Sequence, residues 1–167
     1  IPKQEFVKRT CKEKYLQAID TLRAHIAEGD CYEINYCCEA YCENSVIEPL
    51  KVFAALNKLS PAPFAAYYRN DDKYMMCASP ERYLQKTGNK ILSQPIKGTA
   101  RRDADTAKDN RIKKELQQNI KERAENVMIV DLVRNDLARS CEVGSVRVEE
   151  LMGIYSFPQV HQMISTV

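Results

Sequence analysis

The chain has 167 residues, of which 44% are hydrophobic and 29% are charged, and its formal net charge is +2. This length and apolar content suffice for a compact domain with a buried core, and they exclude an intrinsically disordered chain. No apolar run approaches the roughly 18 residues that a membrane-spanning helix needs, and basic residues alternate with acidic ones. The composition therefore predicts a partner that is neither a membrane nor a nucleic acid.

The first part of the chain is expected to form a helix, a strand and a second helix. Apolar residues recur every three or four positions from Val7 to Ile26, which predicts a helix that Gly29 ends. Alternating residues from Asp30 to about Cys42 predict a strand. Residues 49–59 are expected to form a short helix before a proline-rich stretch.

Two β-hairpins are predicted next. Residues 64–69 and 74–78 flank a polar turn, and residues 82–87 and 90–95 flank Gly88-Asn89. The second hairpin is expected to place Lys97 just past the end of a strand, at the start of an open basic loop.

The last third of the chain predicts one long helix and two strands. Residues 103–139 carry apolar side chains on several sides, so this helix is expected to be buried on much of its surface. Residues 145–149 and 160–167 are expected to be strands. Hairpins combined with separate helices predict an α+β fold, with antiparallel sheets and helices packed outside them.

The chain contains seven cysteines, and their spacing matches no common zinc pattern. Reduced thiols are the simplest interpretation, and they favour a cytoplasmic location. The chain starts with Ile1-Pro2 and has no initiator methionine, so we expect it to begin inside a longer protein.

Lys97 is the first candidate for chemistry. It lies between Pro95-Ile96 and Gly98-Thr99, where glycine allows a close approach of the backbone and threonine offers a hydroxyl and an amide to an anion. A lysine is a nucleophile only when deprotonated, so its site must lower its pKa from about 10.4. The alternative is a loop lysine kept for solubility.

Glu122 and Glu125 stand about one turn apart on one face of the predicted helix. Two such carboxylates can hold Mg²⁺, which prefers oxygen ligands and keeps several waters. The spacing alone favours the alternative, a solvated face on which the carboxylates pair with Lys121 and Arg123.

Two further residues are candidates for proton transfer. Glu81 lies at a turn between two predicted strands and is a candidate general acid; the alternative is a surface pair with Arg82. His161 is a second candidate acid or base, although a lone histidine among apolar strand residues is more often structural.

The order of several motifs resembles the chorismate-utilising enzymes, a family that includes anthranilate, aminodeoxychorismate, isochorismate and salicylate synthases. The matching segments are Ala78-Ser79-Pro80-Glu81, Pro95-Ile96-Lys97-Gly98-Thr99, the run from Lys121 to Asp136, Gly144-Ser145-Val146 and His161-Gln162-Met163-Ile164-Ser165. The position of Lys97 is usually alanine in anthranilate synthases and lysine in aminodeoxychorismate synthases. The resemblance therefore implies amination of chorismate at C4 with ammonia, taken directly or from a glutamine amidotransferase.

The resemblance also implies residue roles. Lys97 is the nucleophile that attacks C2 of chorismate, Glu81 protonates the leaving hydroxyl, and His161 matches a histidine at the reacting ring. Gly98 and Thr99 line the substrate site. Glu125 binds Mg²⁺ at a substrate carboxylate, and Glu122 supports that metal.

Members of the family continue beyond the segment that ends here at Val167, through a second glutamate helix. We therefore expect residues 1–167 to be the N-terminal part of a chorismate-binding catalytic domain that is inactive alone. Anthranilate or isochorismate chemistry, or a non-catalytic chorismate-binding remnant, are the alternatives. Asn126 stands where many members have histidine, and we expect no effect of this departure on the chemistry.

Overall fold

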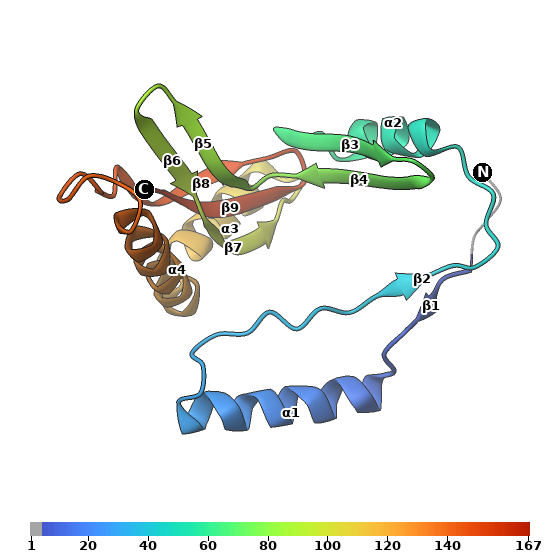
Figure 1. The fold of residues 1–167 in the computed structure, drawn as a ribbon, viewed down its shortest axis with the longest axis horizontal. Helices are drawn as coiled ribbons and strands as arrows, with labels where there is room; N and C mark the ends of the chain where they lie inside the picture. The colour runs from blue at the N-terminus through green and yellow to red at the C-terminus, as the bar shows by residue number, and fades with distance from the viewer. Residues whose placement is uncertain (1–4) are drawn as a thin grey trace. The chain divides into compact units, whose positions relative to one another are not determined.

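The computed structural model describes residues 5–167, which form helices and short antiparallel strands (Figure 1). The chain divides into two compact units, Ile1–Glu48 and Pro49–Val167. Within the described part of the chain, no helix combines the length and the apolar character that a membrane crossing requires.

The N-terminal unit consists of one helix and one short pair of strands. Strand β1 (Val7–Lys8) pairs antiparallel with β2 (Ala40–Tyr41), and helix α1 (Lys12–Glu28) lies between them in the sequence. The predicted end of this helix is confirmed, because Gly29 adopts a φ of 87° and closes the last turn. The predicted start at Val7 is wrong, since Val7 belongs to β1.

The predicted strand from Asp30 to Cys42 is also wrong, apart from Ala40–Tyr41. A strand needs a neighbour along its length to satisfy its backbone groups, and β1 pairs with this segment over two residues. The remaining extended chain packs against α1 instead. The rings of Tyr36 and Tyr15 lie 5.7 Å apart between their centroids.

The C-terminal unit confirms both predicted hairpins and adds a three-stranded sheet. The hairpins join β3 to β4 and β5 to β6, and the third sheet has the order β7-β9-β8, all antiparallel. The elements before α3 are α2 (Pro49–Leu59), β3 (Phe64–Asn70), β4 (Lys73–Ser79), β5 (Arg82–Thr87), β6 (Lys90–Gln94) and β7 (Ile96–Arg101).

The last two strands are β8 (Glu150–Ser156) and β9 (Val160–Thr166). The predicted final strand is confirmed, whereas the one predicted over residues 145–149 is wrong. Ser145 closes a turn with its N–H on the carbonyl of Glu142, and the strand that pairs with β9 begins at Glu150.

The single helix predicted over residues 103–139 is two helices, α3 (Thr106–Gln118) and α4 (Ile120–Ala138). Asn119 separates them, because its ψ is 113° and its side chain accepts a hydrogen bond from the N–H of Glu122 at 3.1 Å. Asparagine favours such a cap over a helix interior. Both helices pack on β7 and β9 (Figure 1), so the predicted α+β arrangement, with helices outside antiparallel strands, is confirmed.

The expected burial of the long helix is wrong for the described chain, because in α4 only Asn126 and Val130 are buried. The core lies instead around β9, where every residue from His161 to Val167 is buried. Alternation along β9 turns His161, Met163 and Ser165 toward the helices. A central strand buried on both faces gives the neighbouring β7 a rigid support.

Candidate functional site

Lys97 is the second residue of strand β7 and is half-buried, so its predicted place in a loop is wrong. Ile96 pairs with Ile164 of β9, and the next pair is Thr99 with Gln162. Two residues of β7, Lys97 and Gly98, therefore lie opposite a single residue of β9, which is a β-bulge. Bulges of this kind change the direction of side chains at active sites.

Gly98 brings this bulge into close contact with α4. Its φ of 98° is in the left-handed region, which favours glycine. A Cβ atom added to Gly98 would lie 3.2 Å from the Cβ atoms of both Glu122 and Met163. Any larger residue would push β7 away from the helix, so Gly98 allows Lys97 and Glu122 to lie close together.

Glu81 lies between β4 and β5, as predicted, and its carboxylate contacts the start of β7. Its Oε1 accepts a hydrogen bond from the N–H of Ile96 at 3.1 Å. Its own N–H donates to the hydroxyl of Ser79 at 3.2 Å. The structure therefore brings Glu81, Lys97, Gly98 and Glu122 together around one end of β7.

Glu122 and Glu125 share one face of α4 with Lys121. The Lys121 ammonium lies 2.9 Å from Oε1 of Glu125 and 3.8 Å from Oε1 of Glu122. The hydrogen bond to Glu125, with the charges of both glutamates, raises the pKa of Lys121. The sequence left open that these carboxylates simply pair with neighbouring cations, and the structure shows such pairing with Lys121.

The same two carboxylates nevertheless suit a hard cation. The Lys121 side chain is 73% exposed, so it can rotate into solvent at little cost when a divalent ion approaches. Magnesium usually takes one or two protein carboxylates and completes its shell with water and ligand oxygens. The metal role of Glu122 and Glu125 stays a prediction.

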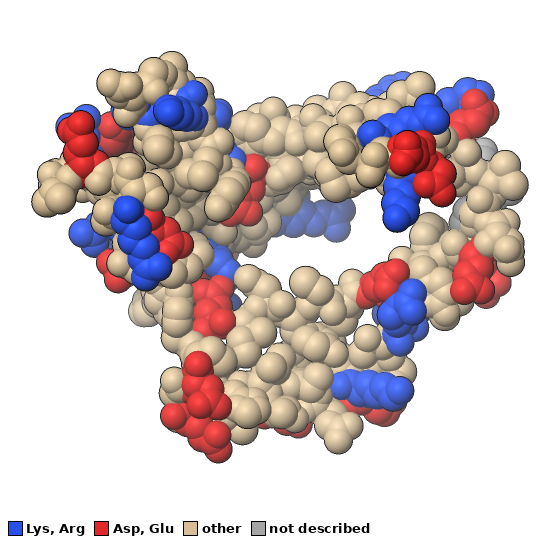
Figure 2. Space-filling view, in the orientation of Figure 1, with Lys and Arg blue, Asp and Glu red and all other residues tan. Residues whose placement is uncertain are grey.

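Surface charges elsewhere are balanced locally in a similar way. On the face that Figure 2 shows, basic and acidic side chains are interspersed. Lys90, for example, lies 2.7 Å from Glu149 and lowers the pKa of that carboxylate.

Thr99 is exposed on β7 and lies directly opposite Gln162 of β9. Gln162 is 8% exposed. Among the buried side-chain nitrogen and oxygen atoms of residues 5–167, its Oε1 is the one that has no hydrogen-bond partner. A single glutamine in a strand has no pattern that marks it as functional, so Gln162 is not among the site residues predicted from the sequence.

His161 is 1% exposed, and both of its ring nitrogens are bonded to protein groups. Nε2 lies 2.9 Å from Oδ1 of Asp109, and Nδ1 lies 2.8 Å from the hydroxyl of Ser156. Arg102 donates to Asp109 at 2.7 Å, and this hydrogen bond is the main reason why the pKa of Asp109 lies far below its ordinary value.

The charged Asp109 therefore fixes the tautomer of His161, with the proton on Nε2 and with Nδ1 accepting from Ser156. The structure does not join these nitrogens to Lys97, Glu81 or Glu122. The structural alternative fits this geometry, and the catalytic role of His161 stays a prediction.

Asn126 is fully buried at the centre of these elements. Its Nδ2 donates to the carbonyls of Lys97 and Met163, both at 3.4 Å, and its Oδ1 accepts from the hydroxyl of Ser165 at 2.5 Å. In the sequence, Asn126 is a departure from the family pattern, for which we expected no effect on the chemistry. No local signal in the sequence indicates that it joins α4, β7 and β9.

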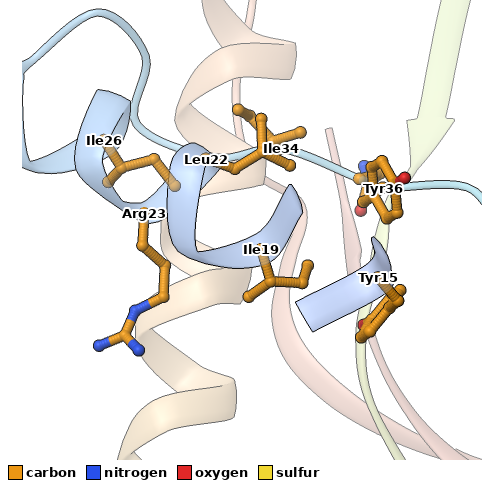
Figure 3. A pocket seen from close by; sticks show the side chains of 8 residues that line it. Tyr15, Ile19, Leu22, Arg23, Ile26, Ile34 and Tyr36 are labelled. Atoms are coloured by element: carbon orange, nitrogen blue, oxygen red, sulfur yellow. The ribbon is translucent and has the colours of Figure 1, made fainter. Parts of the chain in front are cut away.

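The N-terminal unit contains a cavity of about 340 Å³ between α1 and the extended segment that follows it (Figure 3). Its wall is mainly apolar, and the guanidinium of Arg23 points away from Ile34 and Tyr36. None of the predicted site residues lines it. The chemistry predicted from the sequence therefore belongs to the C-terminal unit.

Residues 2–167 match the family of chorismate binding enzymes. The chain belongs to this family. The bulged lysine strand, the neighbouring glutamate and the glutamate-bearing helix are thus features of a chorismate-binding fold.

Two curated relatives are similar to nearly the whole chain. The chain is 40% identical to aminodeoxychorismate synthase component 1 of Klebsiella aerogenes over 156 residues, which cover 93% of this chain and 34% of that protein. It is 37% identical to the chloroplastic aminodeoxychorismate synthase of Arabidopsis thaliana over 168 residues, which cover 99% of this chain and 18% of that protein. The chain thus spans about a third or less of the length of these relatives.

Two solved structures have the same fold. Anthranilate synthase component I from Streptococcus pneumoniae aligns with a TM-score of 0.78 and 24% identity, over 98% of this chain and 36% of that one. The menaquinone-specific isochorismate synthase from Escherichia coli aligns with a TM-score of 0.69 and 14% identity, over 99% of this chain and 40% of that one. At these identities the likeness shows the fold alone.

Proposed function

We propose that this chain carries the nucleophile of an aminodeoxychorismate synthase, which aminates chorismate at C4 with ammonia to give 4-amino-4-deoxychorismate. The observation that carries the proposal is the bulge of β7, which holds Lys97 between Glu81 and Glu122. The relatives named aminodeoxychorismate synthase support it, since they match nearly the whole chain.

Lys97 acts first in this proposal. Its uncharged amine attacks C2 of chorismate, both ring double bonds shift, and the bond from C4 to its hydroxyl breaks. Nζ releases a proton as it bonds to C2. Glu81, in its protonated form, gives its proton to the departing hydroxyl, which leaves as water. The ring is then attached to Nζ of Lys97 as an amine adduct.

Ammonia reverses the attachment. It attacks C4, both ring double bonds shift back, and the bond between C2 and Nζ breaks with the return of a proton to the lysine. The net reaction exchanges the hydroxyl of chorismate for an amino group and releases one water.

Substrate binding is assigned to residues near this strand. Gly98 leaves space beside the lysine, and Thr99 offers its exposed hydroxyl to the substrate. Glu125, supported by Glu122, would hold a magnesium ion. When bound, magnesium would neutralise carboxylate charge on the substrate and favour the uncharged lysine.

The nitrogen source is ammonia, or a glutamine amidotransferase that releases ammonia from glutamine. The designation "component 1" of the Klebsiella aerogenes relative is in keeping with a second component. Activity with ammonium salts alone, and a higher activity with glutamine after addition of an amidotransferase, would support this assignment.

The test uses the protein expressed from its complete gene, incubated with chorismate, an ammonium salt and magnesium, with products separated by chromatography. We expect aminodeoxychorismate from the wild type and none from Lys97→Ala. Lys86→Ala, an exposed lysine of the β5–β6 hairpin, is the matched control and should behave as the wild type. Anthranilate or isochorismate as the wild-type product would refute the proposal, and so would binding of chorismate without any product.

A further inference from the structure

The bulge at Lys97 interrupts the regular pairing of β7 with β9. The residue pairs on either side are Ile96 with Ile164 and Thr99 with Gln162, so the carbonyls of Lys97 and Met163 lie within the irregular stretch. Carbonyls screened from water are satisfied by protein donors. In this protein the side chain of Asn126 donates to both of these carbonyls at 3.4 Å.

We propose that Asn126 is a positioning residue, which locks the β7 bulge and thereby sets the direction in which Lys97 presents its amine. This inference rests on the proposed function, because it explains how the nucleophile of that reaction is held. Asn126 itself acts on the backbone of Lys97 and does not contact the reacting atoms.

The chemistry of an amide matches the task. An asparagine side chain has two N–H donors on one nitrogen and an acceptor oxygen. Both carbonyls contacted by Asn126 accept from Nδ2, while Oδ1 accepts from Ser165 at 2.5 Å. The hydroxyl of Ser165 in turn accepts from the N–H of Met152 in β8 at 2.9 Å, so the side chain of Asn126 is itself held in place.

Asn126 also links the nucleophile to the predicted metal ligands. Glu122 precedes it by four residues and therefore lies on the same face of α4, one turn away. The Cβ of Glu122 is in turn the atom that a side chain on Gly98 would meet at 3.2 Å. One turn of α4 thus contacts both the backbone of Lys97, through Asn126, and Gly98 beside it, through Glu122.

Few other side chains could donate to the carbonyls of both Lys97 and Met163. Leucine has nearly the same shape as asparagine and no donor, so both carbonyls would lose the hydrogen bond from this side chain. Histidine can present one or two N–H groups according to its protonation, but these lie on opposite sides of its ring. It could serve one carbonyl and would leave the bulge less firmly held.

The experiment compares Asn126→Leu with Val130→Ala in the protein expressed from its complete gene. Val130 is also buried on α4, one turn further on, and its truncation destabilises the helix packing without touching the bulge. Each variant is tested for its melting temperature, for kcat and KM with chorismate and ammonium, and for acetylation of Lys97 by limiting acetic anhydride across the alkaline pH range. The acetylation of each lysine is read by peptide mass spectrometry and needs no substrate.

We expect Asn126→Leu to change the rate and the pH midpoint of Lys97 acetylation while that of Lys86 stays as in the wild type. We expect its kcat to fall by about a hundredfold, which is the loss typical of a catalytic group displaced by about 1 Å. Its KM should stay within about threefold of the wild-type value. Val130→Ala should change Lys97 acetylation by less than about twofold. Asn126→His, which keeps one donor, should lie between the wild type and the leucine variant, and it serves as the test if the leucine variant does not fold.

An acetylation profile of Lys97 that matches the wild type in a folded Asn126 variant would overturn the inference, as would a kcat loss no greater than that of Val130→Ala. If the wild type makes no aminodeoxychorismate, the proposed function fails on that result. The acetylation profile then still decides whether Asn126 positions Lys97.

Discussion

Replacement of His161 by alanine decides between its two roles, structural and catalytic. The ring is 1% exposed, so its removal leaves a void beneath β9. Deleting a buried aromatic side chain costs about 3–5 kcal/mol, and a histidine ring is smaller than that of phenylalanine. Asp109 would keep the donors of Arg102 and Asp103, and Ser156 is exposed to water, so lost hydrogen bonds add little. We therefore expect the free energy of unfolding to fall by about 3 kcal/mol.

The assay is urea unfolding at neutral pH of the protein expressed from its complete gene, followed by far-ultraviolet circular dichroism. The kcat of the folded variant is measured at low temperature, where we expect it to stay within about tenfold of the wild type, since loss of a general acid or base typically costs about a hundredfold or more. His25→Ala, at the only other histidine, is the control for stability, since its side chain is half-exposed at the end of α1. A stability loss below about 1 kcal/mol, joined with a kcat loss above about a hundredfold, would refute the structural reasoning and assign His161 to proton transfer.

The remaining predictions concern four acidic residues. Glu81→Gln should lower kcat by about a hundred- to ten-thousandfold with little change in KM, because an amide cannot supply the proton; a defect confined to KM would count against the acid role. Glu125→Gln should abolish the magnesium dependence of chorismate binding in calorimetry and Glu122→Gln should weaken it, since a neutral amide is a poor ligand for this ion; unchanged binding in both would move the metal elsewhere. Asp109 has a lowered pKa, chiefly through Arg102, so its ionised form stabilises the fold above the unfolded value of about 3.9 and this contribution is lost as the pH falls below it. The difference in melting temperature between the wild type and Asp109→Asn should therefore shrink below about pH 4, and a constant difference at acidic pH would contradict the assignment.

The hairpins could be predicted because their signals are local. The turn at Gly88-Asn89 and the alternating residues on both sides determine the pairing of β5 with β6 within a few residues. Gly29 ends α1 for the same kind of reason. The break at Asn119 also has a local cause, but it could not be seen because a single cap residue competes with a long run of helix-forming neighbours.

Strand β7 could not be predicted, because its partner is β9, more than sixty residues further along the chain. The stretch from Lys97 to Arg102 is basic and contains glycine, so its composition is that of a loop. Pairing with a strand so distant depends on the packing of the whole unit. Residues 30–42 were predicted as a strand that the structure largely lacks, and the cause is again a distant partner. An alternating segment forms a strand only where a neighbouring strand lies beside it.

The residues of the candidate site also fall into those that the sequence could predict and those that it could not. Lys97, Glu81 and Glu122 were found because their motifs are distinctive, and the structure brings them together. The sequence did not reveal Asn126 or Gln162, because their environments are formed by separate elements of the fold. Asn126 donates to the carbonyls of two strands. Gln162 has a buried side-chain oxygen without a hydrogen-bond partner. Such contacts have no spacing in the sequence that reveals them.

The central claim is that Lys97 attacks chorismate, and trapping the adduct tests it most directly. The protein from its complete gene is mixed with chorismate and magnesium without ammonia, quenched, digested and analysed by mass spectrometry. We expect a chorismate-derived mass on the peptide that contains Lys97, its disappearance when ammonium is added before the quench, and its absence in Lys97→Ala. Formation of aminodeoxychorismate by Lys97→Ala at a rate near that of the wild type, with no modified Lys97 in either protein, would contradict the account.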